Sequence, residues 1–367
     1  MEKGKISALQ MALLLYPTII ATAILSMPSL TAQSAGRNMW VSPIFASFAG
    51  YLAVFLAVSL HNRYQGKTII QISEAVSGKI VGKMMGFVIL YFYLDLTGTI
   101  ARSYSEFIVT SFLLKTPQIV IISSMVLLCG FCIYGGVEVM ARTGQLLFPV
   151  FVLPIIFSSL FLAPDFQFQN ILPILEDGWI PAIKGAISPT GWFAEFFIIG
   201  FLLPYLSDMK KGMKYGLFTV SGVMLSLVIV NLIVLFILGD ATSNKIYPLM
   251  NVGRYASLGG FFENMEAVIM AVWIAGAFVK ISVFYYVTAL GTAQWLNLSD
   301  YRPLVWPLGI LIVQFSFWGM PSTMEIARYD FQTFPYYSTF IQLLLPMLLL
   351  AIAFVLKRRK KKDKNAS

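Results

Sequence analysis

The stretch ATAILSMPSL at residues 21–30 places a proline inside an apolar span near the N-terminus. A second apolar span contains TGWFAE at 190–195 and continues through Gly200 to Pro204. A proline within a helix removes one amide donor and leaves the carbonyl four residues earlier without its bond, which here concerns Ile24 and Gly200. In hydrocarbon such a carbonyl is tolerated only where protein, water or a ligand meets it. The two stretches therefore predict broken first and sixth helices, and paired broken helices indicate a transporter-type binding site.

The composition is that of a protein that lies within a membrane. Of its 367 residues 58% are hydrophobic and only 12% are charged, whereas soluble domains carry about twice that charged fraction. Ten apolar stretches are each long enough to cross roughly 30 Å of hydrocarbon as a helix. They lie at about 8–32, 38–61, 84–113, 118–137, 140–162, 185–206, 214–239, 258–289, 301–319 and 335–356. We therefore predict an all-α integral membrane protein with ten transmembrane helices.

The distribution of Lys and Arg predicts the orientation, because these residues concentrate in cytoplasmic loops. Most of the 26 fall inside when the N-terminus is placed there, including the run KRRKKK at 357–362. Both termini are therefore expected in the cytoplasm, with 357–367 as a basic tail that also suits contact with anionic lipids. These topogenic residues explain the net charge of +9, which gives no indication of nucleic-acid binding.

The chain is expected to form a single domain, residues 1–367, built from two repeats of five spans. Repeat 1 covers about 8–162 and repeat 2 about 185–356. An odd number of spans in each repeat forces the two repeats to be inverted relative to each other. The two breaks would then meet near the bilayer midplane.

Ionisable residues within the spans indicate the candidate site, because a charge at mid-membrane costs several kcal/mol. Asp95, Arg102 and Glu106 follow one another on the third span at offsets of seven and four, which places them on one helical face. Glu195 is central in the sixth span, and Lys280 lies in the eighth. Asp95 and Glu195 are the deepest by position, and two carboxylates there would repel each other. We therefore expect one of them to be protonated, or Arg102 or Lys280 to neutralise them.

Several of these charges also have a structural interpretation. Glu106 and Glu266 lie near the outer ends of their spans, where contact with lipid headgroups would explain them equally well. Arg102 is suited to pairing with Glu106 four residues on, and Lys280 to extending its ammonium to the cytoplasmic interface. We assign Arg102, Glu106 and Lys280 to a coupling or charge network.

The predicted ligand site combines the two breaks with polar side chains on the third and eighth spans. A broken helix exposes N–H groups that suit a carboxylate and C=O groups that suit an ammonium. Such a site would accept an amino acid or another small nutrient at the midplane. Its predicted contacts are Thr22, Ala23, Ile24, Tyr93, Asp95, Thr97, Phe193, Glu195, Ser282 and Tyr286.

Nothing in the sequence indicates an enzyme, a metal site or a cofactor. His61 is the single histidine, so a histidine-based metal site is not expected. Cys129 and Cys132 form a C-x-x-C within the fourth span, where they are more typical of small apolar filler than of redox chemistry.

Further motifs carry a family resemblance. The ten spans, the first break and the central Glu195 resemble the amino acid-polyamine-organocation superfamily. The stretch GGVEVMAR at 135–142 with Phe148-Pro149, the DYRP sequence at 300–303 and the short basic tail resemble more specifically the B subunit of bacterial spore germinant receptors. The resemblance covers nearly the whole chain.

The resemblance implies a LeuT-like inverted-repeat fold whose first, third, sixth and eighth spans surround the ligand. It also implies a nutrient-sensing role in the inner membrane of a dormant spore, beside an A subunit and a lipoprotein C subunit. One difference from the transporters of the superfamily concerns the residues around Thr22. Those transporters commonly have glycines there, whereas this chain has Ala21 and Ala23, which admit a ligand less closely.

The function that the sequence favours is a ligand-binding membrane subunit that converts nutrient occupancy into a conformational signal for its partners. A proton-coupled amino-acid transporter is the main alternative, with Asp95, Glu195 or Lys280 as the proton carrier. A passive ion or water pathway would use the same polar residues without a tight ligand site. Arg142 and the loop at 207–214 are candidate partner contacts that topogenic charge explains equally well.

Overall fold

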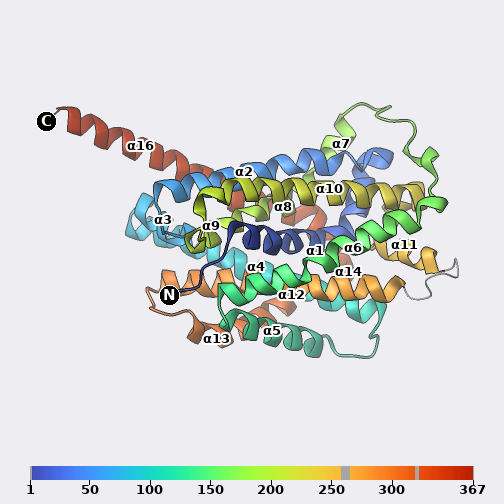
Figure 1. Ribbon diagram of the computed structural model, residues 1–367, viewed down its shortest axis with the longest axis horizontal. Coiled ribbons are helices and arrows are strands. Elements are labelled where there is room, and N and C mark those ends of the chain that lie inside the picture. The colour runs from blue at the N-terminus through green and yellow to red at the C-terminus, as the bar shows by residue number, and fades with distance from the viewer. Residues whose placement is uncertain (1, 258–264, 319–321, 367) are drawn as a thin grey trace.

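The structure is a computed structural model that describes residues 2–257, 265–318 and 322–366 (Figure 1). Within these residues the fold is all-helical, and the one extended pairing is an isolated bridge between Ile6 and Leu206. The long helices run side by side along the long axis of the molecule, and both termini lie at the same end (Figure 1). The predicted all-α class is therefore confirmed.

Eight helical segments of the described chain are long and apolar enough to cross a membrane. The first four are Ala8–Asn38 (α1 and η1), Ser42–Arg63 (α2), Lys79–Ser111 (α4) and Val137–Phe161 (α6). The others are Ile187–Tyr205 (α8 to η5), Met209–Asn244 (η6 to η7, with α10 Gly212–Leu238), Ala267–Trp295 (in α12, Met265–Trp295) and Met324–Leu356 (in α14 to α16). The predicted fourth and ninth spans are the apolar helices α5 (Gln118–Tyr134) and α13 (Arg302–Trp318), of only 17 residues each. Shorter helices are α3 (Ile69–Ser77), α7 (Ile180–Gly185) and α11 (Pro248–Ser257).

Large apolar side chains cover the outside of this helical bundle. Phe48, Leu146 and Ile310 are 65%, 76% and 72% exposed. An apolar surface of this extent is tolerated only against lipid or a partner. Together with the long apolar helices, it makes the chain a multi-pass integral membrane protein.

The first span is a continuous helix, so the prediction of a break in it is wrong. α1 (Ala8–Ala35) includes Pro17 and Pro28 without interruption. Each proline removes a single backbone bond, and the neighbouring bonds are kept. The Thr31 hydroxyl donates to the carbonyls of Met27 and Pro28 at 2.9 and 3.2 Å. α1 is also buried among α6, α10 and α12, so protein surrounds it on several sides.

The sixth span is interrupted as predicted. It consists of α8 (Ile187–Ala194), a 3₁₀ turn η4 (Glu195–Ile198), α9 (Ile199–Leu202) and a second 3₁₀ turn η5 (Leu203–Tyr205) that includes Pro204. A 3₁₀ stretch within a helix often marks a hinge or a functional site. Here the tighter turn begins at Glu195, the charged residue of the span.

The last span begins earlier than the predicted 335–356. α14 (Thr323–Arg328) continues through the π-helical turn η8 (Tyr329–Thr333) into α15 (Phe334–Thr339), and a second π turn η9 (Phe340–Leu344) leads into α16 (Leu345–Ala366). Residues 323–334 contain neither Gly nor Pro to end a helix. The extension brings Asp330 inside the apolar helix, where the predicted boundary placed it outside.

Candidate functional site

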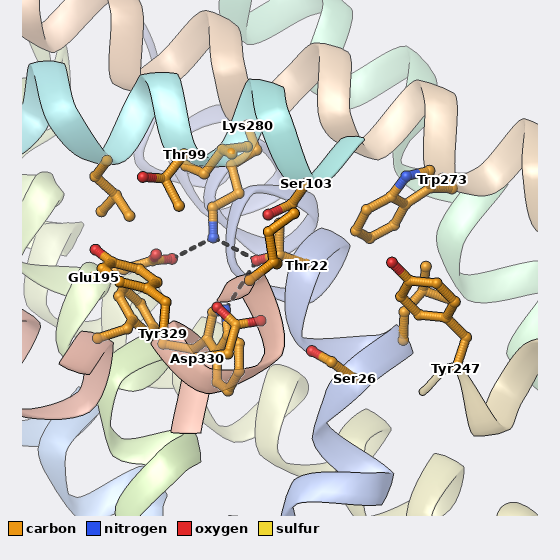
Figure 2. Close-up of a pocket in the computed structure, with 16 residues that line it drawn as sticks. Thr22, Ser26, Thr99, Ser103, Glu195, Tyr247, Trp273, Lys280, Tyr329 and Asp330 are labelled. Carbon is orange, nitrogen blue, oxygen red and sulfur yellow. Dashed lines mark hydrogen bonds and ion pairs between the residues drawn. The ribbon is translucent and has the colours of Figure 1, made fainter. Parts of the chain in front are cut away.

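A cavity of about 50 Å³ lies where α1, α4, α8, α12 and the last span meet (Figure 2). Its lining is unusually polar for the interior of a membrane protein. The polar and aromatic residues around it are Thr22, Ser26, Thr99, Ser103, Trp192, Glu195, Tyr247, Trp273, Lys280, Tyr329 and Asp330. Leu25, Leu96, Ile100, Ile326 and Phe334 complete the wall.

A buried ion pair dominates one side of the cavity. Lys280 Nζ lies 2.7 Å from Glu195 Oε2, and the two side chains are 0% and 1% exposed. Lys280 also donates to Thr22 Oγ1 at 2.7 Å, and Trp192 Nε1 donates to the same oxygen at 3.0 Å (Figure 2). These bonds connect α1, α12 and the interrupted sixth span.

The ion pair leaves one acceptor unused. Glu195 Oε1 is buried and has no hydrogen-bond partner within the described chain. Removing two charges from water costs several kcal/mol for each ion, which a pair repays only when its remaining lone pairs are satisfied. An unsatisfied carboxylate oxygen beside a cavity therefore marks a place where a ligand or a water molecule can donate.

Asp330 places a second carboxylate on the cavity. It lies in the π turn η8, and its carboxylate is directed toward the Lys280 ammonium and the Thr22 hydroxyl (Figure 2). It interacts electrostatically with Lys280 and Glu195. Sequence reasoning missed this residue because the predicted span began at residue 335. The absence of a helix breaker in 323–334 is the signal that could have found it.

Three of the predicted residues meet at the cavity, and the others do not line it. Thr22 and Glu195 are predicted ligand contacts, and Lys280 is predicted to belong to the charge network. In the structure Lys280 donates a hydrogen bond to each of the other two side chains. Predicted contacts that do not line this cavity are Ala23, Ile24, Tyr93, Asp95, Thr97, Phe193, Ser282 and Tyr286. The side chain of Glu266 lies outside the described residues.

The geometry of α4 explains the position of Asp95. The residues of this helix that line the cavity are Leu96, Thr99, Ile100 and Ser103. At 100° per residue, Asp95 lies roughly a quarter turn away from the centre of that face. Asp95 does share a face with Arg102 and Glu106, as predicted, but this face does not line the cavity.

Arg102 and Glu106 form a separate pair. Arg102 Nη2 lies 3.6 Å from Glu106 Oε2, both side chains are largely buried, and the guanidinium lies 5.4 Å from the centre of the Phe317 ring. Gln118 donates to Glu106 as well. These contacts fit the structural interpretation of the two residues.

A second cavity of about 50 Å³ adjoins the polar one and is almost wholly apolar. Ile24 lines it together with side chains of α6, α10 and α12. Leu25 and Trp273 line both cavities, so they form the partition between a polar and an apolar space.

The N-terminal residues 2–7, which we call the strap, lie at the end of the bundle where the termini are found (Figure 1). Ile6 N donates to Tyr205 O at 3.0 Å, and Ser207 N donates to Ile6 O at 2.9 Å. Lys5 Nζ donates to Pro204 O at 3.0 Å. The strap therefore satisfies carbonyls at the end of the interrupted sixth span.

Both sequence motifs noted above meet the strap. In the GGVEVMAR motif, Val137 N donates to Glu2 Oε2 at 2.9 Å, and Lys5 N donates to Glu138 Oε1 at 2.9 Å. In the DYRP motif, the Tyr301 hydroxyl donates to Glu2 Oε2 at 3.3 Å. Tyr286, predicted as a ligand contact, donates to the same oxygen at 3.4 Å. Its position is explained by this contact with the strap.

Comparison with known families decides the relationship. A family model described as "Spore germination protein" matches residues 5–323. The chain belongs to this family of spore germination proteins. The family membership predicted from the motifs is therefore confirmed, and the chain is a membrane protein of spore germination.

Curated members of this family match over almost their full length. Spore germination protein KB of Bacillus subtilis (strain 168) is 23% identical over 100% of this chain and 99% of its own. Spore germination protein YndE of the same strain is 25% identical over 98% and 99%, and spore germination protein A2 is 24% identical over 97% of each chain.

Solved transporter structures share the fold. MhsT in complex with L-phenylalanine has a TM-score of 0.62 at 14% identity, covering 94% of this chain and 87% of that one. Mhp1, a nucleobase-cation-symport-1 transporter in a closed conformation with bromovinylhydantoin bound, has a TM-score of 0.73 at 12% identity, covering 97% and 80%. A Na⁺-coupled sialic acid symporter has a TM-score of 0.67 at 12% identity, covering 92% and 79%. The predicted LeuT-like architecture is confirmed at the level of the fold.

Proposed function

We propose that this chain is the nutrient-binding membrane subunit of a spore germinant receptor. The observation that carries the proposal is the polar cavity, in which the Lys280–Glu195 pair and Thr22 connect the interrupted sixth span to α1 and α12. The ligand is an amino acid or a nutrient of similar size. Occupancy changes the arrangement of these helices, and partner subunits detect the change.

The size of the cavity supports a coupling between binding and helix movement. A volume of about 50 Å³ has room for a few water molecules. A larger ligand would require the lining side chains or the surrounding helices to move. Binding would therefore favour a wider arrangement, and a ligand shifts such an equilibrium by its difference in affinity for the two arrangements. The 3₁₀ turn at Glu195 is the element best placed to move.

The family supports a proposal for the partners and the location. We propose that the chain works beside a germinant receptor A subunit and a lipoprotein C subunit in the spore inner membrane, with both termini in the cytoplasm. The common end of the two termini in Figure 1 and the basic run at 357–362 support this orientation. In this proposal the chain is one domain of two inverted repeats, residues 8–162 and 185–356, and it performs no catalysis.

A proton-coupled amino-acid transporter is the second candidate. The fold shared with MhsT and with the sialic acid symporter supports it. So does the buried Lys280–Glu195 pair, because intramembrane carboxylates and lysines carry protons in many transporters.

Germination of spores in which this chain is the sole member of its family tests the proposal. We expect Thr22→Val and Glu195→Gln to raise the nutrient concentration for half-maximal germination by at least roughly tenfold. The measurement is the loss of spore absorbance after addition of nutrient, with receptor abundance followed by immunoblot. Asp95→Asn is the matched control, because this carboxylate does not line the cavity. An unchanged response in both variants would place the site elsewhere.

A further inference from the structure

We propose that the Asp330 carboxylate and the free oxygen of Glu195 together bind one positively charged group. The shared chemistry is a single monovalent cation, supplied either by the ammonium of an organic nutrient or by an inorganic cation. The inference rests on the proposed function of this cavity and deepens it by naming the chemical class of the ligand.

Charge balance is the first argument. Glu195 and Lys280 neutralise each other at 2.7 Å. Asp330 is then the carboxylate of the cavity without a counter-ion, since Lys280 is the one cation among the described residues that line it. Arg102 is paired with Glu106 on a different face of α4. With all three groups ionised the cavity carries one net negative charge, which a single cation would balance.

The arrangement of acceptors is the second argument. Within the described chain Asp330 makes no hydrogen bond or ion pair. Glu195 Oε1 is buried on the same cavity and is also without a partner, in a residue that is 0% exposed. The hydroxyls of Ser26, Thr99 and Ser103 line the cavity nearby (Figure 2). The free carboxylate oxygens of Asp330 and Glu195, among hydroxyls, are the oxygen-rich surroundings that suit an ammonium or a hard monovalent cation.

The backbone at Asp330 is the third argument. The residue lies in a π-helical turn, a form that occurs mostly as single turns and often at functional sites. The turn widens the helix just where the carboxylate faces Lys280 (Figure 2). Asp330 is only partly exposed within an apolar helix, where a carboxylate without a counter-ion is costly and a bound cation would reduce that cost.

The test uses the purified full-length chain in nanodiscs, in a buffer whose only cation is N-methyl-D-glucamine. Separate arms add sodium chloride, potassium chloride, methylammonium chloride, glycine or L-alanine at constant ionic strength. Binding is followed by the fluorescence of the tryptophans, of which Trp192 and Trp273 line the cavity, and by the thermal unfolding midpoint. We expect a saturable response in at least one arm. A response to sodium or potassium identifies an inorganic cation, and a response confined to the amines identifies an organic ligand.

Asp330→Asn should weaken that response by at least roughly tenfold, whereas Asp95→Asn should leave it unchanged. The Asn variant should also unfold at the same or a higher temperature than the wild type in the N-methyl-D-glucamine buffer without any added cation, because it removes an unbalanced charge. It should lose the stabilisation that the cation gives the wild type. This second readout separates loss of binding from loss of folding.

Two results would overturn the inference, and they differ in what they leave standing. Undiminished glycine or L-alanine binding by Asp330→Asn would contradict the role of Asp330 and leave the proposed nutrient site intact. A wild-type protein that responds in none of the arms would contradict both the inference and an amino-acid ligand at this cavity.

Discussion

The Lys280–Glu195 ion pair lies at the centre of the candidate site. Neutralising one of its two residues should lower the free energy of unfolding. Glu195→Gln leaves the buried Lys280 ammonium without its counter-ion, which typically destabilises a protein by about 3–5 kcal/mol. The measurement is chemical or thermal unfolding of the purified variant in detergent micelles. The double variant Glu195→Leu, Lys280→Met should recover most of the loss, since two apolar side chains need no partner.

Asp300→Asn is the control for this comparison. Asp300 Oδ1 lies 3.5 Å from Arg302 Nη1, and both side chains are more than a third exposed. An exposed pair contributes at most about 1 kcal/mol, so this variant should unfold like the wild type. If Glu195→Gln also unfolded like the wild type, the buried pair would not be ionised as described.

Part of the candidate site could be predicted from buried charges in the sequence. Thr22, Glu195 and Lys280 could be predicted because a central charge or a polar residue near a proline is conspicuous in an apolar span. The prediction for Asp95 rests on its depth, but depth does not determine which face of a helix lines a cavity. Asp330 was not predicted because its identification depends on where the last span begins. The ends of helices are the features that a sequence-based assignment locates least accurately.

At the scale of elements, the contact between α8 and α15 depends on Gly191. A Cβ at this position would lie 2.8 Å from Phe334 Cε1 and 3.0 Å from Pro335 Cα. Ser338 also donates to Gly191 O at 2.7 Å. Gly191→Ala should therefore force the last span away from the sixth and cost about 1–3 kcal/mol in unfolding free energy.

Gly200→Ala is the matched substitution within the same span. The nearest atom to its added Cβ is Ala57 Cβ at 3.7 Å, an ordinary contact distance. Stability should be unchanged or higher by about 0.4–1 kcal/mol. Equal destabilisation by both substitutions would show that the sixth span resists any added side chain, and the specific contact with α15 would not explain the effect.

The two predicted helix breaks show that a proline within a span does not by itself determine whether the helix is interrupted. The sixth span is interrupted, and its 3₁₀ turns extend from Glu195 to the proline. The first span contains two prolines and stays helical, because one lost hydrogen bond is small compared with the packing of α1 among its neighbours. Tertiary packing determines whether the helix continues through a proline, and a local sequence pattern contains no information about this packing.

At the scale of the whole molecule, the strap is expected to control access to the cavity from the end where the termini lie. The double variant Glu2→Ala, Lys5→Ala removes its bonds to Val137 N and Pro204 O. A cysteine introduced as Ser26→Cys, on the cavity, should then react faster with a membrane-impermeant maleimide. The background is the labelling of the two buried native cysteines, measured in the protein that retains Ser26.

Lys3→Ala is the control for the strap, because this side chain is exposed and makes none of those bonds. It should leave the labelling rate unchanged. Equal labelling rates in all variants would mean that the strap does not limit access.

The overall architecture was largely predictable, because apolar stretches and the distribution of Lys and Arg report directly on membrane crossing. Helices correspond to all the predicted spans, although α5 and α13 have only 17 residues and residues 258–264 of the eighth lie outside the described part. The strap was not predicted, since it depends on contacts between residues 2–7 and three distant segments.

The central claim is that the polar cavity binds a nutrient without carrying it across the membrane. The most direct test adds ¹⁴C-labelled L-amino acids to the purified chain in liposomes with an inward proton gradient. The account predicts saturable label that stays with the protein, is reduced in Thr22→Val and is unaffected by a protonophore. Accumulation of label in the liposome lumen that collapses on addition of the protonophore would contradict it and favour the transporter.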